Sequence, residues 1–366
     1  MMTNTIVLLL FLVGLDSVLG SVVNRYYHII ESHMTWVDAQ TYCRSSGFID
    51  LATVYSQTDA FDMDLMHFYA WLGPYRTDPN STWLFYPEDS ASNFQTWAPG
   101  EPQEHDLCTV AHYPDRLAYG TSCDSPHFAY CEYTTYSERH EKHYTALAFV
   151  PQTMTWSEAT EHCTPHREDL WTDHVGSTSV RVANFPVWIG LYREGETWSW
   201  STAETEYRHW DDEEPSAGNC VTIASLTKKM STKNCSSLYP FTCFSDNLIL
   251  VKENKTWEEA LEHCRSFWMY PYNHYYIHSG LVSVQPGEDH AYMRLRVREA
   301  TTEKVWVGLR FLVDQWRWVN GVDMLFSDLP ECPVEQQRCG ALSANSNSST
   351  LEPMDCLETN NFLCYI

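Results

Sequence analysis

Cysteine is the residue type whose spacing says most about chemistry in this 366-residue chain. Twelve of the thirteen cysteines form three sets of four. The sets are Cys43, Cys108, Cys123 and Cys131; Cys163, Cys220, Cys235 and Cys243; and Cys264, Cys339, Cys356 and Cys364. The middle pairs are 15, 15 and 17 residues apart, and the outer pairs 88, 80 and 100. The pattern predicts disulfides and an oxidising compartment, but four cysteines allow three connectivities, and spacing alone does not choose among them.

Catalytic motifs are absent from the sequence. There is no His-Glu-x-x-His, no Gly-x-Ser-x-Gly, no phosphate-binding glycine loop and no Cys-x-x-Cys. The sixteen histidines are scattered, and we interpret them as surface or core residues rather than metal ligands. We therefore predict that the chain is not an enzyme, has no catalytic residue and needs no cofactor.

The charge balance excludes two classes of partner. Lys and Arg number 23 and Asp and Glu 48, which gives a formal net charge of −25. Such a chain repels phosphate backbones, so we expect no nucleic-acid binding. It also lacks the basic character needed to dock on anionic lipid. Beyond residues 6–15, no apolar run approaches the roughly 18 residues that a membrane helix needs, so we expect no membrane insertion.

The amino-terminal residues are typical of an export signal. The apolar stretch 6–15 is followed by small residues, and a cut after Gly20 would make residues 1–20 a signal peptide. Residues 1–5 contain no Lys or Arg, and a buried strand or a short anchor is the alternative. Four sequons, at Asn80, Asn234, Asn254 and Asn347, agree with a secreted, extracellular glycoprotein.

A threefold repeat organises the rest of the chain. Similar segments begin Thr35-Trp36, Thr155-Trp156 and Thr256-Trp257, and each places an acidic residue three positions after the threonine and a cysteine seven after the tryptophan. Each threonine is expected to cap a helix. A second motif recurs as Trp71-Leu72-Gly73, Trp188-Ile189-Gly190 and Trp306-Val307-Gly308, which we expect to be a buried strand. We place three domains at 21–134, 143–245 and 247–366, with a polar linker at 133–143.

The helix with Trp and Cys, the Trp-Ile-Gly-Leu strand and the late cysteine pair resemble the C-type lectin-like domain family. The tandem arrangement resembles part of the ectodomain of macrophage mannose receptor-type proteins. The resemblance implies an α+β fold of three tandem domains, each with two helices, small antiparallel sheets and a long loop. It also implies the pairs Cys43–Cys131, Cys108–Cys123, Cys163–Cys243, Cys220–Cys235, Cys264–Cys364 and Cys339–Cys356. Loss of Cys43 is then expected to unfold the first repeat.

Sugar-binding members of that family hold calcium with oxygen ligands around a proline and before the second and third cysteines. In the first repeat Glu101, Gln103 and Asp106 match part of this set. The expected Asn-Asp pair is replaced by Tyr119 and Gly120. The second and third repeats depart further. We therefore expect calcium binding to be absent, with weak ligand binding at Glu101, Gln103 and Asp106 as the remaining possibility.

Cys332 is left over after twelve cysteines are paired. It is either a free or capped thiol or the site of an interchain disulfide that makes a covalent homodimer.

These features predict a secreted multi-domain C-type lectin-like protein that recognises a glycan or a cell-surface or secreted protein without calcium, in a context such as innate immunity. The alternatives are a calcium-dependent mannose-type lectin acting through the first domain, and a disulfide-linked structural or interaction protein.

Overall fold

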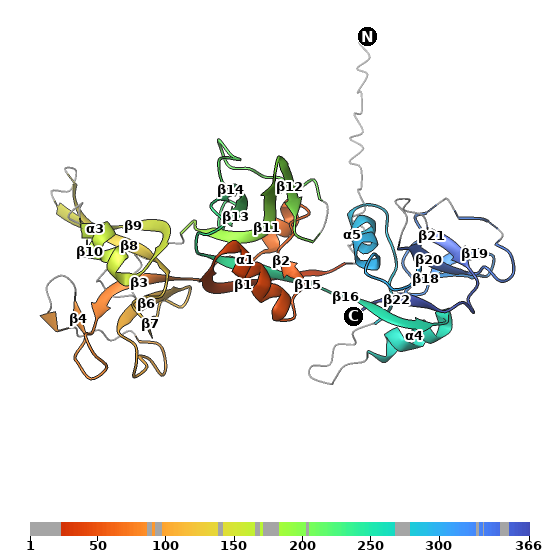
Figure 1. Cartoon of the computed structure of the whole chain (residues 1–366), viewed down its shortest axis with the longest axis horizontal. Coiled ribbons are helices and arrows are strands. Elements are labelled where there is room, and N and C mark those ends of the chain that lie inside the picture. Colours follow the sequence, from red (N-terminus) through yellow and green to blue (C-terminus); the bar gives the residue numbers. More distant parts are fainter. Residues whose placement is uncertain are drawn as a thin grey trace, which may run out of the picture. The chain divides into compact units, whose positions relative to one another are not determined.

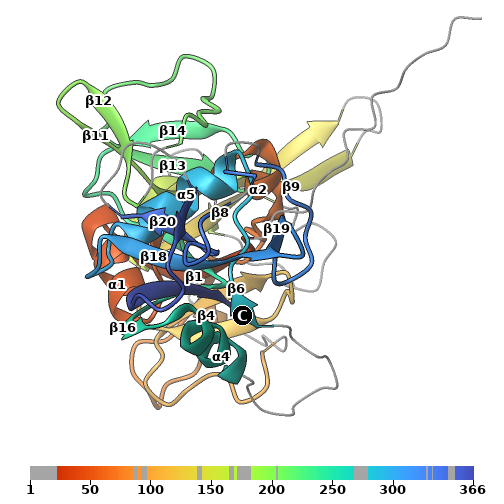
Figure 2. The same ribbon diagram turned by 90° about the vertical axis from the view of Figure 1, so that its right-hand side faces the viewer.

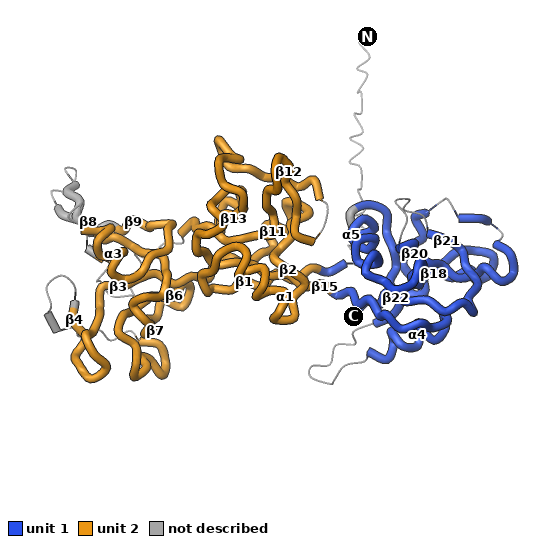
Figure 3. Tube along the Cα trace, viewed as in Figure 1, with its two compact units in different colours: residues 1–24, 247–366 blue, residues 25–246 orange. Residues whose placement is uncertain are grey.

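The computed structural model describes residues 23–85, 90–91, 97–137, 142–164, 169–170, 183–202, 205–267, 279–326, 329–331, 333–344 and 351–366. The chain forms two compact units (Figure 3). Unit 1 consists of residues 1–24 and 247–366, and unit 2 of residues 25–246. The third repeat thus stands in a unit of its own, whereas the first two share one.

Each repeat has a helix that begins directly after its predicted threonine cap. These helices are α1 (Trp36–Ser45), α3 (Trp156–Cys163) and α4 (Trp257–Ser266). Thr155 and Thr256 form complete capping boxes with the glutamates three residues on. Thr35 accepts a hydrogen bond from the Asp38 backbone N–H, but the shorter Asp38 carboxylate does not return one to the cap backbone. The predicted caps are confirmed.

Unit 1 is a self-contained module. Its sheet has the order β16-β22-β18-β20-β21, with β17 beside β22 and β19 beside β18. The strands are β16 (Leu248–Lys255), β17 (Gly280–Leu281), β18 (Lys304–Leu312), β19 (Gln315–Trp318), β20 (Cys339–Ser343), β21 (Leu351–Met354) and β22 (Asn360–Tyr365). Helices α4 and α5 (Glu288–Val297) lie on opposite sides of β18 and β22 (Figure 1; Figure 2). The first strand of the repeat, β16, pairs with the last, β22.

Unit 2 contains two lobes, and each lobe takes residues from both of the first two repeats. Lobe A is formed by the described parts of 68–137 and 142–170, and lobe B by those of 25–63 and 183–246. Lobe A contains β3 (Phe68–Tyr75), β4 (Leu84–Phe85), β5 (Ser90–Ala91), β6 (Cys108–Tyr113), β7 (Ala118–Thr121), β8 (His127–Ser137), β9 (Lys142–Met154), α3 and β10 (Asp169–Leu170). Lobe B contains β1 (Arg25–Met34), α1, β2 (Asp50–Leu51), α2 (Gln57–Asp62), β11 (Pro186–Glu194), β12 (Thr197–Trp200), β13 (Cys220–Ala224), β14 (Met230–Lys233) and β15 (Tyr239–Asp246).

The two repeats have exchanged their amino-terminal halves. Strand β1 of the first repeat pairs antiparallel with β15, the last strand of the second. Strand β9, which opens the second repeat, pairs with β8, the last strand of the first. In Figure 1 the red β1 and α1 accordingly lie with green β11 and β15, and α3 and β9 lie with β3 and β8.

A pair of tryptophan hydrogen bonds joins the two halves of every lobe. The helix tryptophan donates its indole N–H to the carbonyl of the residue after the strand tryptophan: Trp36 to Ile189 at 2.8 Å, Trp156 to Leu72 at 2.9 Å and Trp257 to Val307 at 2.9 Å. The strand tryptophan donates back to the carbonyl two residues before the helix tryptophan: Trp188 to Met34, Trp71 to Met154 and Trp306 to Lys255. The bonds are the same in all three modules, but only the third makes them within one repeat.

Because of the exchange, two of the six disulfides differ from those predicted. Cys43 is joined to Cys243, and Cys131 to Cys163, so the predicted pairs Cys43–Cys131 and Cys163–Cys243 are wrong. The other four pairs, Cys108–Cys123, Cys220–Cys235, Cys264–Cys364 and Cys339–Cys356, are as predicted. Each helix cysteine still bonds to a final-strand cysteine, because the helix stays in its usual place within the lobe.

A local hairpin explains why the halves exchange. Strands β8 and β9 pair from His127 with Met154 out to Ser137 with Lys142, with only residues 138–141 between them. Closing so short a connection costs less chain entropy than bringing β1 back across the whole first repeat. Strand β9 therefore takes the edge of β8, and β1 pairs with the free edge of β15. The predicted linker at 133–143 is largely strand instead.

Aromatic side chains pack the two lobes against each other. Phe185, at the start of the lobe B sheet, lies 4.9 Å from Phe68 and 5.3 Å from Phe128 of lobe A, measured between ring centroids. His33 of β1 lies 5.0 Å from Phe128. Phe68, Phe128 and Phe185 are each almost fully buried. This shared core makes unit 2 one body.

Candidate ligand-binding loops

Each repeat carries a long loop that ends at its second cysteine. The loops comprise the described parts of residues 76–107, 201–219 and 319–338. At equivalent positions, five residues after the strand tryptophan, Arg76, Arg193 and Phe311 donate a backbone N–H to the carbonyl just before that cysteine. The loops are thus anchored in the same way, and they differ in the side chain at this position.

Arg76 organises the loop of the first repeat. Its guanidinium donates to the backbone carbonyls of Asp106, Pro79, Gln103 and Glu104. The bonds to Pro79, Gln103 and Glu104 measure 2.7–2.8 Å. The side chain is buried and stacks on Trp83, 4.9 Å from the ring centroid. A fixed cation bound to several carbonyl oxygens holds the loop, as charge-assisted hydrogen bonds are stronger than neutral ones.

Glu101 uses its carboxylate to hold the backbone. Its Oε2 accepts the Gly120 N–H at 2.9 Å, across the loop. Gly100 before it has a φ of +86°, the left-handed conformation that favours glycine. The Glu101 carboxylate, which was predicted to bind a ligand, therefore closes the loop.

Asp106 and Gln103 also bond within the loop. Asp106 Oδ2 accepts the Gln103 backbone N–H at 2.7 Å, and Gln103 Nε2 donates to the Gly100 carbonyl at 2.8 Å. Burial raises the pKa of Asp106. The three predicted residues Glu101, Gln103 and Asp106 are brought together, and they bond mainly to the loop itself.

These residues do not fit a calcium site. Calcium takes about six to eight oxygen ligands. Gly120 supplies no side-chain oxygen, and a Cβ there would lie 2.1 Å from Asp106 Oδ2, so Asp106 fills the space of a side chain at that position. Tyr119, the other replaced position, donates its hydroxyl to Asp115 at 2.9 Å. We derive no role for calcium at this loop.

The loop of the second repeat is closed by the equivalent glutamate. Glu214 Oε2 accepts the Thr232 backbone N–H at 3.0 Å, the Thr232 hydroxyl at 2.5 Å and the Ser216 N–H at 2.8 Å. Burial opposes ionisation, but these hydrogen bonds lower the pKa of Glu214. Thr232 stands three residues before the third cysteine, as Gly120 does, so Glu101 and Glu214 have the same role.

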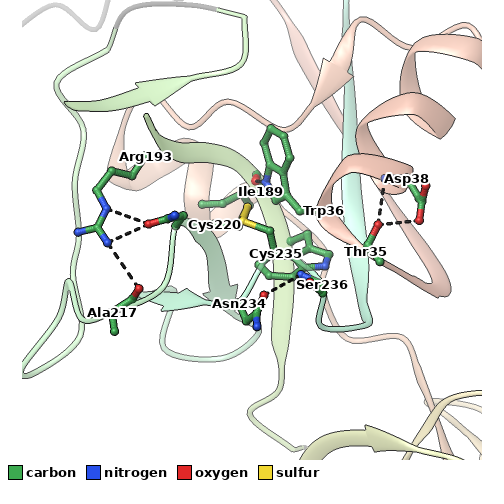
Figure 4. Close-up of a disulfide and its surroundings, with 12 residues drawn as sticks. Thr35, Trp36, Asp38, Ile189, Arg193, Ala217, Cys220, Asn234, Cys235 and Ser236 are labelled. Atoms are coloured by element: carbon green, nitrogen blue, oxygen red, sulfur yellow. Dashed lines mark hydrogen bonds between the residues drawn. A yellow bond between two sulfur atoms is a disulfide. The ribbon is translucent and has the colours of Figure 1, made fainter. Parts of the chain in front are cut away.

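Arg193 supports the second loop with fewer contacts than Arg76. It donates to the Asn219 side-chain oxygen at 2.9 and 3.1 Å and to the Ala217 carbonyl at 3.5 Å (Figure 4). It lies 5.2 Å from the Trp198 ring centroid. Figure 4 also shows Trp36 of the first repeat reaching the strand of the second beside the Cys220–Cys235 disulfide.

The third loop is held by aromatic contacts instead. Phe311 packs 5.3 Å from Trp316, whose indole donates to the Pro330 carbonyl at 2.9 Å. The nearby Arg310 turns to the helix, pairing with Glu258 and stacking on Trp257. The three loops therefore present different surfaces on one frame.

Sequence reasoning missed Arg76 and Arg193. The signal was available, because both stand five residues after the strand tryptophan. Their bonding to loop carbonyls follows from the fold and not from a motif.

Three predicted glycosylation residues, Asn80, Asn234 and Asn254, are exposed. Asn347 and Cys332 lie outside the described residues, as does the predicted signal peptide at 1–20. Among the described helices, none has the length and apolar character needed to cross a membrane.

Comparisons with known proteins agree with this fold. The family model of the lectin C-type domain matches residues 32–133, 152–244 and 253–366. The bovine (Bos taurus) secretory phospholipase A2 receptor is 23% identical over 268 residues, which are 58% of this chain and 17% of the receptor. Dromaiocalcin-1 of Dromaius novaehollandiae is 33% identical over 89 residues, 23% of this chain and 63% of that protein. The chain thus spans less than a fifth of the receptor.

Two solved structures were also matched. Human lithostathine has 16% identity and a TM-score of 0.27, and the match covers 61% of this chain and 92% of that one. Ovocleidin-17 of Gallus gallus has 23% identity and a TM-score of 0.25, and the match covers 32% of this chain and 88% of that one.

The family and the named relatives support a lectin-like binding protein and give some support to the expectation that it is not an enzyme. The predicted α+β fold of three tandem modules is confirmed. With three matches that together cover most of its length, the chain belongs to the C-type lectin domain family.

Proposed function

We propose that the protein is exported and recognises a glycan or a protein ligand through its long loops, without calcium. The observation that carries this proposal is the use of Glu101 and Glu214. Both carboxylates close their loops by accepting backbone N–H groups from positions where calcium-binding relatives have ligands. A loop held by Arg76 and Glu101 needs no ion to keep its shape.

Export is supported by the disulfides. Six bonds join twelve cysteines, and such density is typical of proteins that fold in an oxidising compartment. The predicted cleavage after Gly20 is tested by sequencing the amino terminus of the protein recovered from culture medium.

The test of calcium independence is a screen of glycans and cell-surface proteins with added calcium and with EDTA. We expect binding that EDTA leaves unchanged and that Arg76→Ala weakens, because the loop carbonyls lose their common donor. Arg193→Ala tests the loop of the second repeat in the same way, and Lys252→Ala, at an exposed position outside the loops, is the control. Binding that EDTA abolishes and that Glu101→Ala removes would overturn the proposal and favour a calcium lectin.

We further propose a covalent homodimer through Cys332. The other twelve cysteines are paired, so this residue is the one left for an interchain bond. Non-reducing electrophoresis should show a dimer that disappears in Cys332→Ser. A monomer band from the unmodified protein would contradict the proposal.

A further inference from the structure

We propose that Glu31, His67 and His112 form a binding site for one divalent transition-metal ion, with Zn²⁺ the best match. The site lies where the exchanged strand β1 meets lobe A. Glu31 belongs to β1, His67 to the segment that leads into β3, and His112 to β6. Two imidazoles and a carboxylate are a ligand set that suits zinc.

The ligand atoms already converge. Glu31 Oε1 lies 3.5 Å from His112 Nε2 and 3.7 Å from His67 Nδ1, and one ligand atom from each residue lies within 4.8 Å of the others. A tetrahedral zinc ion with bonds of about 2.0–2.2 Å places its ligand atoms about 3.3–3.5 Å apart. Small side-chain rotations therefore suffice to close the three ligands on an ion, with a fourth position left for water.

The orientation of His112 favours metal binding. Its Nδ1 is 2.8 Å from Asp115 Oδ2, and Asp115 is itself held by the Tyr119 hydroxyl and the Leu117 N–H, each at 2.9 Å. If Nδ1 carries the proton, Nε2 presents a lone pair. Nε2 is buried and makes no hydrogen bond with the described residues. A metal-binding histidine typically has such a carboxylate behind it.

His67 is placed in a similar but looser way. Its Nδ1 lies 3.7 Å from Glu31 Oε1, and its Nε2 lies 3.6 Å from Asp64 Oδ2, which is an ion-pair contact rather than a hydrogen bond. A proton on Nε2 leaves the Nδ1 lone pair facing Glu31. In that tautomer three acceptor atoms converge, and a cation between them would satisfy all three.

The competing cation is a proton. Burial lowers the affinity of His112 for a proton, but the Glu31 and Asp115 carboxylates outweigh it and raise the pKa of His112. The tyrosines that face the cluster, Tyr69 and Tyr119, have raised pKa values and do not supply charge near neutrality. A histidine must be neutral to bind a metal ion, so acid should displace the metal.

The other repeats do not carry this ligand set. The residues that correspond to Glu31, His67 and His112 are Lys252, Thr302 and Ser343 in the third repeat, and Pro151, Asn184 and Ala224 in the second. The site thus depends on the first repeat and on β1 having crossed to lobe B. An ion there would tie the exchanged strand to lobe A.

The test is titration of metal-free full-length protein with Zn²⁺ at pH 7.5, by calorimetry and by competition with a chromophoric chelator. We expect one site that is lost in His67→Ala, His112→Asn and Glu31→Gln, and kept in His105→Ala, which removes an exposed histidine of the same repeat. Asp115→Asn should weaken binding about 10–100-fold, as for other residues behind a metal ligand. At pH 5.5 the affinity should fall.

Folding is checked separately. Circular dichroism and the disulfide map of each metal-free variant should match those of the parent, and the zinc-induced rise in melting temperature should be absent from the ligand variants alone. Zinc binding that survives all three ligand substitutions, or no zinc binding by the parent protein, would overturn the proposal.

Discussion

Units 1 and 2 are built from the same contacts, made by different partners. In unit 1 the helix of the third repeat bonds to the strand and final cysteine of its own repeat. In unit 2 the helix of the first repeat makes those contacts with the second repeat, and the helix of the second repeat makes them with the first. Every half of a module carries the face that makes these contacts. The choice of partner depends on the connections, above all on the short length of chain between β8 and β9.

The largest expected effect concerns the exchanged disulfides. Cys43 and Cys243 close a separation of 200 residues, and their joint replacement by alanine should cost about 5 kcal/mol by the chain-entropy model. The loss of stability should appear in lobe B. The number of free thiols should not change, because both partners of the disulfide are replaced. Peptide mapping should recover Cys43–Cys243 and Cys131–Cys163. A map with Cys43–Cys131 would show that the two halves are not exchanged.

Replacement of the helix tryptophans should reveal which repeat each one supports. Trp36 and Trp257 are buried, and their replacement by alanine should cost about 3–5 kcal/mol. Trp156 is half-buried, so its replacement should cost less. Trp36→Ala should increase hydrogen exchange around Ile189, and Trp156→Ala around Leu72, each in the other repeat. Trp257→Ala is the control, because its effect should stay within unit 1. Effects confined to the mutated repeat in every case would contradict the exchange.

Acid should weaken unit 2 through His127. Burial lowers the pKa of His127 to about 3, and both ring nitrogens are buried without a hydrogen bond among the described residues. The folded pKa lies below the unfolded value of about 6.5, so this contribution is complete above about pH 6.5 and is lost as the pH falls. At pH 5 the loss is about 2 kcal/mol. The free energy of unfolding, measured in urea at several pH values, should depend less on pH in His127→Phe. An unchanged pH dependence would show that His127 does not cause the loss of stability in acid.

The smallest effect should come from the helix caps. Thr155→Ala and Thr256→Ala each remove the hydroxyl that accepts the backbone N–H of the residue three positions on, and should cost about 1 kcal/mol. Glu158→Ala should add to this loss, because it removes the carboxylate that accepts the Thr155 backbone N–H. Asp38→Ala should cost less than Glu158→Ala, because Asp38 does not bond back to the cap backbone. Urea unfolding of the variants gives the order of the costs, and equal costs for Glu158→Ala and Asp38→Ala would show that the returned bond has no measurable value.

The loops show how far a motif predicts a site. Glu101, Gln103 and Asp106 were identified by their positions around a proline and a cysteine, and the structure brings them together. Their bonding to Gly120 and to the loop backbone was not predictable, because it depends on how closely two distant segments approach. The cluster of Glu31, His67 and His112 gave no sequence signal, since its members are far apart in the chain and come from different lobes.

The sequence by itself determined three modules, their capped helices and their buried Trp-Gly strands, and its resemblance to the family implied the four disulfides that stay within a repeat. The helices and strands follow from local spacing, which sets the faces that each segment must bury. The tertiary structure alone decided which halves combine, how Arg76 and Arg193 hold their loops, and where Glu31 meets two histidines. The physical reason is that the first two repeats carry equivalent complementary faces. A pattern that occurs more than once cannot identify its own partner, and the low entropy cost of the short β8–β9 connection makes that choice.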